Sequence, residues 1–257
     1  MLSRLPYYTE VLIESGMALL LLEEIRKNAP QAQIIYHAAD RLATIGAHPM
    51  AQDVLTKQSD KIDLVRLVAE DIRADIPPER PTLYLQHGIE KALFDDATVS
   101  PYDRPNNAIS VGDMLFDGQA VEAMALENPD WTFHLFGAKA SLSRPFENVV
   151  THGERPFKEI APFVRFTDVG IAPYAGDRGA DYISQSSIKM IQYSYCRLPM
   201  VAPQFAAAGR DHVSSYDPGD QASIRAAFKR AISYDRSLIV PFSVLSWDEV
   251  VERLFPN

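Results

Sequence analysis

The sequence has little of what several classes of protein require. Among its 257 residues there is a single cysteine, Cys196, so no internal disulfide can form and a reducing compartment fits best. The longest apolar run, residues 17–22, is far shorter than the roughly 20 residues of a membrane-spanning helix. The N-terminus lacks the charged start and long apolar stretch of a secretory signal. These features predict a soluble protein of the cytoplasm.

Basic residues are also few. Lys and Arg total 25 against 34 Asp and Glu, which gives a formal net charge of −9. No local basic stripe is visible, and this counts against nucleic-acid binding. The histidines show no metal-ligand spacing, and the chain lacks the glycine-flanked serine of hydrolases and the Gly-x-Gly-x-x-Gly fingerprint of dinucleotide-binding folds. These absences disfavour metal, serine-hydrolase, NAD and ATP chemistry, and they leave nucleotide-sugar chemistry open.

Short apolar runs alternate with segments of helical periodicity. Apolar residues make up 47% of the chain, which is enough for a large buried core. The pattern predicts strands near 11–13, 34–37, 63–68, 83–85, 108–111, 131–136, 148–150, 169–172 and 199–202, the last of these being the final strand. It predicts helices near 17–28, 49–59, 118–128, 157–166, 188–196, 221–233 and 247–254. Such alternation is typical of an α/β fold with parallel sheets covered on both faces.

A stretch without apolar periodicity separates two such series. Residues 95–107 contain Pro101, Pro105 and several Asp and Asn residues, which indicates a linker between domains. We therefore expect a first domain over 1–97 and a second over 98–240, followed by a terminal segment over 241–257. Ligands of open α/β sheets bind beyond the carboxyl ends of the strands. Functional residues should therefore directly follow the strands.

The segment 182–193 carries the strongest constellation of polar residues. Ser186 and Ser187 are good N-caps for a helix that begins near Ile188. The first turn of such a helix offers unpaired N–H groups and the positive end of the helix dipole, which together suit a phosphate. Lys189 adds a mobile positive charge there, and Gln192 shares its helix face. A serine-capped helix with a solvated lysine is an equally good interpretation of this pattern.

Other polar side chains also follow predicted strands. Asp40 comes after the strand at 34–37, where a carboxylate can take a proton from a bound hydroxyl, although a turn or cap is its commoner role. Glu154 follows the strand at 148–150, where it can bond a base or ribose, or simply cap the next helix. Met114 and Tyr174 stand at strand ends where a nucleotide could lie between them, yet such residues more often serve packing.

Several of these motifs occur together, in the same order, in one protein family. Ile-Glu-Ser-Gly at 13–16, His-Gly-Ile at 87–89 and Ser-Ser-Ile-Lys-Met-Ile-Gln-Tyr at 186–193 resemble the GumK β-glucuronosyltransferases of glycosyltransferase family 70. The likeness continues through 36–45, 111–117, 170–174 and 246–248 and so covers nearly the whole chain. It implies a GT-B fold, in which a first Rossmann-like domain binds the acceptor and a second binds the nucleotide sugar. The C-terminal helix is expected to pack back towards the first domain.

The resemblance also implies an activity. Family members transfer glucuronic acid, with inversion, from UDP-glucuronate to a mannose on a polyprenyl-diphosphate-linked oligosaccharide in exopolysaccharide biosynthesis. They need no metal ion or cofactor, since the UDP-sugar is a substrate, and they work in peripheral contact with the cytoplasmic face of the inner membrane. An inverting displacement needs one base for the acceptor hydroxyl and positive charge for the departing UDP.

Carried over residue by residue, the resemblance assigns these roles. The catalytic base falls on Asp40 and the donor-binding lysine on Lys189. The positions that line the UDP pocket fall on Met114, Glu154, Tyr174, Gln192 and the backbone of Ser187 and Ile188. Two positions depart from the family pattern: Arg155 stands where an apolar residue beside the uracil is expected, and Ile188 replaces a methionine.

This chain resembles only the later part of the acceptor domain of the family. Roughly the first half of that domain precedes the segment equivalent to 14–16, so we expect a truncated first domain whose sheet has an exposed edge. Two alternatives stay open: a UDP-sugar-binding module without transfer activity, and a sugar-nucleotide epimerase of the same architecture. A retaining transferase is disfavoured because no glutamate occurs from 182 to 201. The donor sugar, the acceptor and the oligomeric state stay undetermined by sequence.

Overall fold

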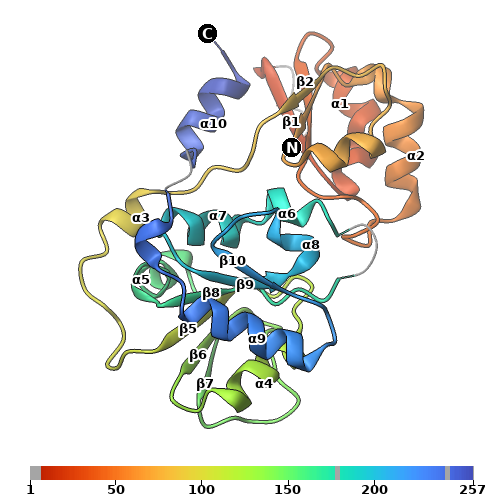
Figure 1. Ribbon diagram of the computed structural model, residues 1–257. Helices are drawn as coiled ribbons and strands as arrows, with labels where there is room; N and C mark the ends of the chain where they lie inside the picture. Colours follow the sequence, from red (N-terminus) through yellow and green to blue (C-terminus); the bar gives the residue numbers. More distant parts are fainter. Residues whose placement is uncertain (1–6, 177–179, 241–243, 257) are drawn as a thin grey trace. The chain divides into compact units, whose positions relative to one another are not determined.

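The computed structural model describes residues 7–176, 180–240 and 244–256, which form two compact units (Figure 1). Within the described residues, the first unit contains 7–87, 180–186 and 249–256, and the second contains 88–176, 187–240 and 244–248. Residues 95–107, the predicted linker, lie within the second unit. There the Tyr102 hydroxyl donates a hydrogen bond to the Phe163 carbonyl at 2.8 Å, so this polar stretch is attached to the body of the unit.

The first unit is built on a parallel sheet with the strand order β1-β2-β3-β4. The strands are β1 (Glu10–Glu14), β2 (Gln33–Ala38), β3 (Leu64–Leu67) and β4 (Thr82–Tyr84). β2 is buried from Ile34 onward because it is a central strand with both faces covered. β1 lies at the edge of the sheet, and its Leu12 is 48% exposed.

Short helices cover this sheet. The predicted helix over 17–28 is divided into a 3₁₀ segment, η2 (Met17–Leu21), and α1 (Leu22–Asn28). Gly16 precedes η2 with a φ of 126°, a backbone conformation that favours glycine, and the first turns wind more tightly than an α-helix. The other helical segments that contribute to the unit are α2 (Pro49–Lys57), η3 (Ser59–Lys61), η4 (Glu70–Asp75), α6 (Ile183–Ser186) and the end of α10 (Trp247–Leu254).

The second unit is built on a larger parallel sheet with the order β10-β9-β8-β5-β6-β7. Its strands are β5 (Asn107–Val111), β6 (Thr132–Phe136), β7 (Val149–Gly153), β8 (Val169–Ile171), β9 (Met200–Pro203) and β10 (Val213–Tyr216). The prediction that β9 is the final strand is wrong, because β10 follows and pairs with it in parallel. β10 carries two serines between Val213 and Tyr216, so it presents no apolar run to recognise.

Helices lie on both faces of the larger sheet (Figure 1). α4 (Gly118–Glu127) and α9 (Gln221–Ile232) pack together over one face, where Phe133 of β6 and Phe228 of α9 join the main core. The other helical segments are α3 (Ala92–Asp95), α5 (Phe157–Phe166), α7 (Ile188–Tyr195), α8 (Gln204–Ala207) and η5 (Arg236–Leu238). The predicted α/β class with parallel sheets is confirmed. No helix in the described residues has the length and apolar character that crossing a bilayer requires.

Candidate functional site

The predicted donor-binding residues of the second unit follow the carboxyl ends of its strands. Met114 comes after β5, Glu154 after β7 and Tyr174 after β8. Because neighbouring strands of this sheet run parallel, these ends meet at one edge. The segment that carries Lys189 begins at the same edge, since α7 lies on the crossover from β8 to β9. The predicted donor-binding residues therefore lie along the carboxyl edge of the second sheet.

α7 begins with the predicted serine cap. The Ser187 hydroxyl accepts a hydrogen bond from the Met190 N–H at 3.3 Å and shares a second hydrogen bond with the Tyr174 hydroxyl at 2.7 Å. A cap of this kind satisfies one of the N–H groups that the first turn leaves unpaired. The helix and its cap are confirmed, and Tyr174 holds the cap in place.

Tyr193 fixes the body of α7 to the sheet. Its buried hydroxyl donates to the Ile109 carbonyl at 3.2 Å and accepts from the Val111 N–H at 3.1 Å. The ring lies against β8, where only a glycine fits: a Cβ at Gly170 would be 2.5 Å from a carbon of the Tyr193 ring. This close approach sets the distance between α7 and the sheet, and with it the position of Lys189.

The loop after β5 and the loop after β8 are joined. The Ala175 N–H donates to the Leu115 carbonyl at 2.6 Å, and the Asp117 N–H donates to the Pro173 carbonyl at 2.8 Å. Tyr174 forms an antiparallel bridge between these two bonds. The residues that follow two adjacent strands thus form one connected rim, which fixes the backbone of Tyr174.

The Lys189 ammonium lies over this rim. Its Nζ atom is 4.7 Å from the centroid of the Tyr174 ring, which is a cation–π geometry. It also lies close to the end of β5, since a Cβ at Gly112 would be 3.9 Å from Nζ. Burial lowers the pKa of Lys189 to about 8, while the negative charge of Asp113 acts in the opposite direction. The Lys189 amine is therefore mostly protonated near neutral pH. It carries this charge in a position that is partly shielded from solvent.

The structure brings some predicted donor residues together and leaves others apart. Tyr174 contacts Lys189 through its ring and Ser187 through its hydroxyl. Gln192 is buried on the same helix, whereas Ile188 is 38% and Met114 45% exposed. The exposed Glu154 and Arg155 follow β7, where the Arg155 Nε donates to the His152 carbonyl at 3.3 Å. Among the described residues Met114, Glu154, Arg155, Gln192 and Ile188 have no hydrogen bond, ion pair or ring contact to Lys189.

Asp113 belongs to this rim although the sequence-based set of site residues does not contain it. Its Oδ2 atom accepts a hydrogen bond from the Lys139 N–H at 2.6 Å, which braces the loop after β6. A Cβ at Gly137 would lie 3.0 Å from the Asp113 Cβ, so the two loops are in close contact. A Gly-Asp pair directly after a strand is the signal by which this carboxylate could be found.

In the first unit, Asp40 lies in a bend directly after β2. Ser15 holds this bend: its hydroxyl accepts from the Ala39 N–H at 3.0 Å and from the Asp40 N–H at 3.2 Å. The same hydroxyl donates to the His37 carbonyl at 3.2 Å. Three backbone groups of the bend are thus bound to one serine, and the main chain of Asp40 has a fixed position.

A tyrosine is hydrogen-bonded to the Asp40 carboxylate. The fully buried Tyr182 donates its hydroxyl hydrogen to Asp40 Oδ1 at 2.8 Å. Burial raises the pKa of Tyr182, and the charge of Asp40 raises it further, so this hydroxyl stays protonated and acts as a donor. Burial also raises the pKa of Tyr36 to about 12, with smaller contributions from the charges of Asp75 and Asp40. Oδ2 of Asp40 takes part in no hydrogen bond within the described chain, and the residue is partly exposed.

A buried basic cluster lies at the same end of the first sheet. Arg66 of β3 is the register partner of His37 on β2, and its guanidinium donates to the Leu85 and Gln86 carbonyls at 3.2 and 2.9 Å. The rings of His37 and His87 are 5.8 Å apart. Burial lowers the pKa of His37 to about 3 and that of His87 to about 4, with the Arg66 charge acting in the same direction. Both imidazoles are therefore neutral at physiological pH.

Acidic, histidine and cysteine side chains do not gather into a group of three or more that could hold a metal ion in the described parts of the chain. His134 and His152 approach each other, with Nδ1 and Nε2 3.0 Å apart, but they do so inside a ring cluster with Phe136 and Phe163. Burial lowers the pKa of His134 to about 4. His134 is also hydrogen-bonded through Nε2 to Asn107 Oδ1 at 3.1 Å, so both of its ring nitrogens have protein partners.

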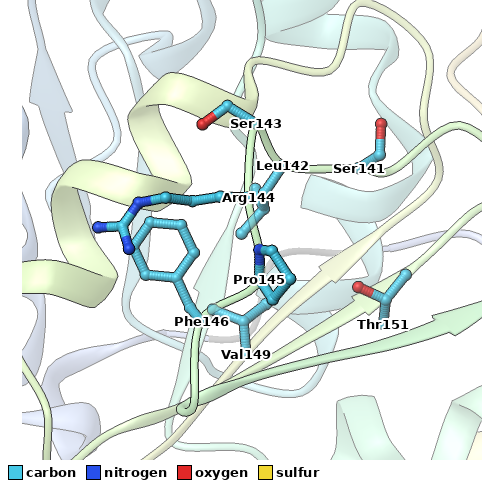
Figure 2. Close-up of a pocket in the computed structure, with 8 residues that line it drawn as sticks. All are labelled: Ser141, Leu142, Ser143, Arg144, Pro145, Phe146, Val149 and Thr151. Carbon is cyan, nitrogen blue, oxygen red and sulfur yellow. The ribbon is translucent and has the colours of Figure 1, made fainter.

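A pocket of about 400 Å³ lies in another part of the second unit, beside the loop between β6 and β7 (Figure 2). In it the Arg144 guanidinium lies over the Phe146 ring, with 4.4 Å between the guanidinium carbon and the ring centroid. The pocket is lined by Ser141, Leu142, Ser143, Arg144, Pro145, Phe146, Val149 and Thr151. None of the predicted site residues lines it, so the chemistry of the candidate site does not involve this pocket.

Comparisons with known proteins agree with the family resemblance. Residues 1–68 match the family model described as glucuronosyltransferase GumK, N-terminal domain. The UDP-glucuronate:glycolipid 2-beta-glucuronosyltransferase of Xanthomonas campestris pv. campestris is 27% identical over 245 residues. That match covers 95% of this chain and 61% of the relative, so the chain spans less than two thirds of the relative's length. The predicted likeness to the GumK glucuronosyltransferases is confirmed.

Solved structures share the fold. Sucrose-phosphate synthase from Thermosynechococcus elongatus superposes with a TM-score of 0.69 at 12% identity, over 96% of this chain and 72% of that one. An α,α-trehalose-phosphate synthase (UDP-forming) from Burkholderia xenovorans has a TM-score of 0.64 at 11% identity, over 91% and 68% of the two chains. An E. coli structure described as trehalose-6-phosphate bound with UDP-2-fluoro glucose has a TM-score of 0.65 at 16% identity, over 98% and 70%. These are GT-B glycosyltransferases, and the predicted GT-B fold is confirmed.

Proposed function

We propose that this chain is a glycosyltransferase that moves glucuronic acid from UDP-glucuronate to a lipid-linked saccharide, with inversion and without a metal ion. The observation that carries the proposal is the position of the Lys189 ammonium, held beside the Ser187-capped start of α7 at the carboxyl edge of the second sheet. The similar Xanthomonas protein is named for UDP-glucuronate and a glycolipid, which supports this donor and this class of acceptor.

The donor diphosphate would bind at the start of α7. The N–H groups of the first helical turn and the helix dipole attract an anion, and the Lys189 ammonium adds a full positive charge. The low pKa of Lys189, about 8, reflects an unfavourable desolvation that a diphosphate would offset. The nucleoside would lie towards Met114, Glu154 and Arg155 at the neighbouring strand ends. The charge of the lysine and the dipole would stabilise the departing UDP.

Asp40 would act as the base. In a single displacement the acceptor hydroxyl oxygen bonds to the anomeric carbon as the bond from that carbon to the UDP oxygen breaks. The hydroxyl proton passes to the Asp40 carboxylate, and UDP leaves with the bonding electron pair. Such proton transfer by a positioned carboxylate contributes about 10²- to 10⁴-fold to a rate. Oδ2 of Asp40, which has no hydrogen bond in the described chain, is the oxygen suited to this role.

The acceptor and the place of action belong to the same proposal. A polyprenyl-diphosphate-linked saccharide would serve as acceptor in exopolysaccharide biosynthesis, at the cytoplasmic face of the cell membrane, with peripheral contact between protein and lipid. The name of the Xanthomonas relative supports only the general class, a glycolipid.

Calorimetric titration tests the donor site. The protein is titrated with UDP, UDP-glucuronate and UDP-glucose, each with and without magnesium. We expect all three to bind without magnesium, and UDP-glucuronate to bind more tightly than UDP-glucose. Incubation with UDP-glucuronate and a lipid-linked mannosyl acceptor should then give a product whose new anomeric centre is β by NMR. Absence of UDP binding, or an α-linked product, would contradict the proposal.

A second candidate function is favoured by the share of the Xanthomonas relative that this chain covers. Since the chain spans 61% of the Xanthomonas relative, a module that binds UDP-sugar but transfers nothing is the main alternative. Binding in the titration together with no product at any acceptor concentration would select it. An epimerase would instead convert the UDP-sugar itself with no acceptor present, which the same NMR measurement detects.

A further inference from the structure

Tyr182 is attached to the first unit although its neighbours in sequence lead into the second. It is fully buried, and its hydroxyl donates to Asp40 Oδ1 at 2.8 Å. Within the same segment, Gln185 Oε1 accepts a hydrogen bond from the Glu70 N–H at 2.8 Å. Side chains at two positions of the segment 180–186 are therefore hydrogen-bonded to residues of 7–87. One of the two reaches the proposed base.

The Asp40 carboxylate is held at one oxygen and open at the other. Ser15 fixes the backbone N–H of Asp40, and the Arg41 guanidinium beside it forms an ion pair with Asp75 at 3.2 Å. With the main chain fixed, the orientation of the carboxylate depends on the Tyr182 hydroxyl at Oδ1. Hydrogen bonds from a neutral donor to a carboxylate are short and strong, so this contact restricts rotation of the group.

We propose that Tyr182 is a positioning residue, which holds the Asp40 carboxylate so that Oδ2 receives the proton of the acceptor hydroxyl. This inference rests on the proposed function, because it concerns the base of that reaction. Tyr182 would touch neither substrate. Its role is to reduce the orientations that the carboxylate adopts before the reaction begins. The raised pKa of Tyr182 keeps its hydroxyl protonated, so it remains a donor over the working pH range.

The test is the Tyr182→Phe variant of the whole chain described above, in a steady-state transfer assay. The ring and its packing stay, and only the hydroxyl is lost. We expect kcat to fall about 10- to 100-fold, the effect of losing one hydrogen bond to a charged group, while the KM for UDP-glucuronate stays within about twofold. The matched control is Tyr195→Phe, whose hydroxyl also donates to an aspartate, Asp95, at 2.8 Å. Its kcat should equal that of the wild type.

A double-mutant cycle separates a role through Asp40 from a general structural role. Tyr182→Phe in an Asp40→Asn background should cause no further loss of rate, because the group that it orients is already gone. An additional 10-fold loss in that background would overturn the inference, and so would a wild-type kcat in Tyr182→Phe alone when Asp40→Asn lowers transfer at least about 10²-fold. If Asp40→Asn itself leaves transfer unchanged, the proposed function fails instead.

A measurement without turnover tests the hydrogen bond itself. The carboxyl carbons of the aspartates are observed by ¹³C NMR, and the Asp40 signal is assigned by its loss in Asp40→Asn. Tyr182→Phe should shift this signal and leave the others in place, whereas Tyr195→Phe should shift only the Asp95 signal. An unmoved Asp40 signal in Tyr182→Phe would overturn the positioning role even in a protein without transfer activity.

Discussion

The Tyr174 ring lies under the Lys189 ammonium, with 4.7 Å from Nζ to the ring centroid, while the Tyr174 hydroxyl is hydrogen-bonded to Ser187 at 2.7 Å. One tyrosine therefore contacts both the side chain of the lysine and the cap of the helix that carries it. Since the loop of Tyr174 is itself joined to the loop after β5, the positive charge is positioned by the sheet rather than by the helix alone. Such rigidity favours binding of a fixed anion.

Removal of this charge should weaken nucleotide binding. In Lys189→Ala we expect UDP affinity to fall about 10- to 100-fold, as charge-assisted hydrogen bonds to the diphosphate are lost, and transfer to become undetectable. Calorimetry measures the affinity and a radiolabel assay the transfer. The control is Lys57→Ala, which removes an exposed lysine paired with Asp53 at 3.6 Å and should change neither quantity. Near-normal turnover in Lys189→Ala would reject the role of the lysine.

The pH dependence of UDP binding should report the titration of Lys189. Burial holds its pKa near 8 in the free protein, and a bound diphosphate favours the charged form. Above about pH 7, binding of UDP should therefore be accompanied by uptake of up to one proton by Lys189. The affinity for UDP should fall about 30-fold between about pH 7 and 9.5. Calorimetry in buffers of different ionisation enthalpy measures the uptake. Lys189→Arg, which stays charged, should bind with nearly constant affinity, and a similar decline in that variant would contradict the assignment.

Asp40→Asn should separate chemistry from binding. The amide keeps the shape of the side chain but cannot accept the proton, so transfer should fall by at least about 10²-fold while UDP affinity stays unchanged. The control is Asp53→Asn on the exposed surface of α2, which should retain full activity. Unchanged turnover in Asp40→Asn would remove this residue from the mechanism.

The close approach of Gly170 and Tyr193 should be sensitive to a single methyl group. In Gly170→Ala a Cβ placed 2.5 Å from the Tyr193 ring must displace α7, and we expect the free energy of unfolding to fall by about 2–3 kcal/mol. Urea denaturation measures this loss. Gly46→Ala, where no atom lies within 4 Å but φ is +62°, separates backbone strain from collision and should cost only about 1 kcal/mol. Equal losses in the two variants would argue against the collision.

Mild acid should destabilise the protein through its buried histidines. Burial lowers the pKa values of His37 to about 3 and of His87 and His134 to about 4, all below the ordinary value of 6.5. As pH falls from about 6.5 to 4, these histidines become protonated in the unfolded chain but stay neutral in the folded one. The free energy of unfolding should therefore fall by about 2 kcal/mol per histidine by about pH 5. Denaturation at about pH 7.5 and 5 measures this. His134→Gln should show a shallower slope, and a flat profile in the wild type would contradict the shifts.

The donor side of the site could be predicted from local pattern. Two serines before an apolar helix that carries Lys189 predicted the cap and the start of α7, since capping depends on neighbouring residues. Residues after strand ends, such as Tyr174 and Met114, could also be placed at the sheet edge. The contact between Lys189 and the Tyr174 ring could not, because it depends on how α7 packs against β8.

The contacts that Asp40 makes with Ser15 and Tyr182 could not be predicted from the sequence. Ser15 is 25 positions away from Asp40 in sequence and Tyr182 is 142 positions away, so no periodicity or spacing links them. Tyr182 also directly precedes the short helix α6, which the sequence analysis did not predict. β10 escaped prediction for a different reason, since its two central serines hide a strand that the parallel pairing with β9 stabilises. Both the Tyr182–Asp40 hydrogen bond and the β9–β10 pairing join segments through the tertiary fold, which local sequence patterns do not reveal.

The discontinuity of the first unit has a consequence for biosynthesis. Its sheet is encoded entirely before residue 88, whereas Tyr182 emerges from the ribosome only after β5 to β8 of the second unit. The nascent chain therefore holds the Asp40 carboxylate without its tyrosine partner for much of translation. The carboxylate is synthesised early, and the tyrosine that binds it follows only after most of the second sheet has been synthesised.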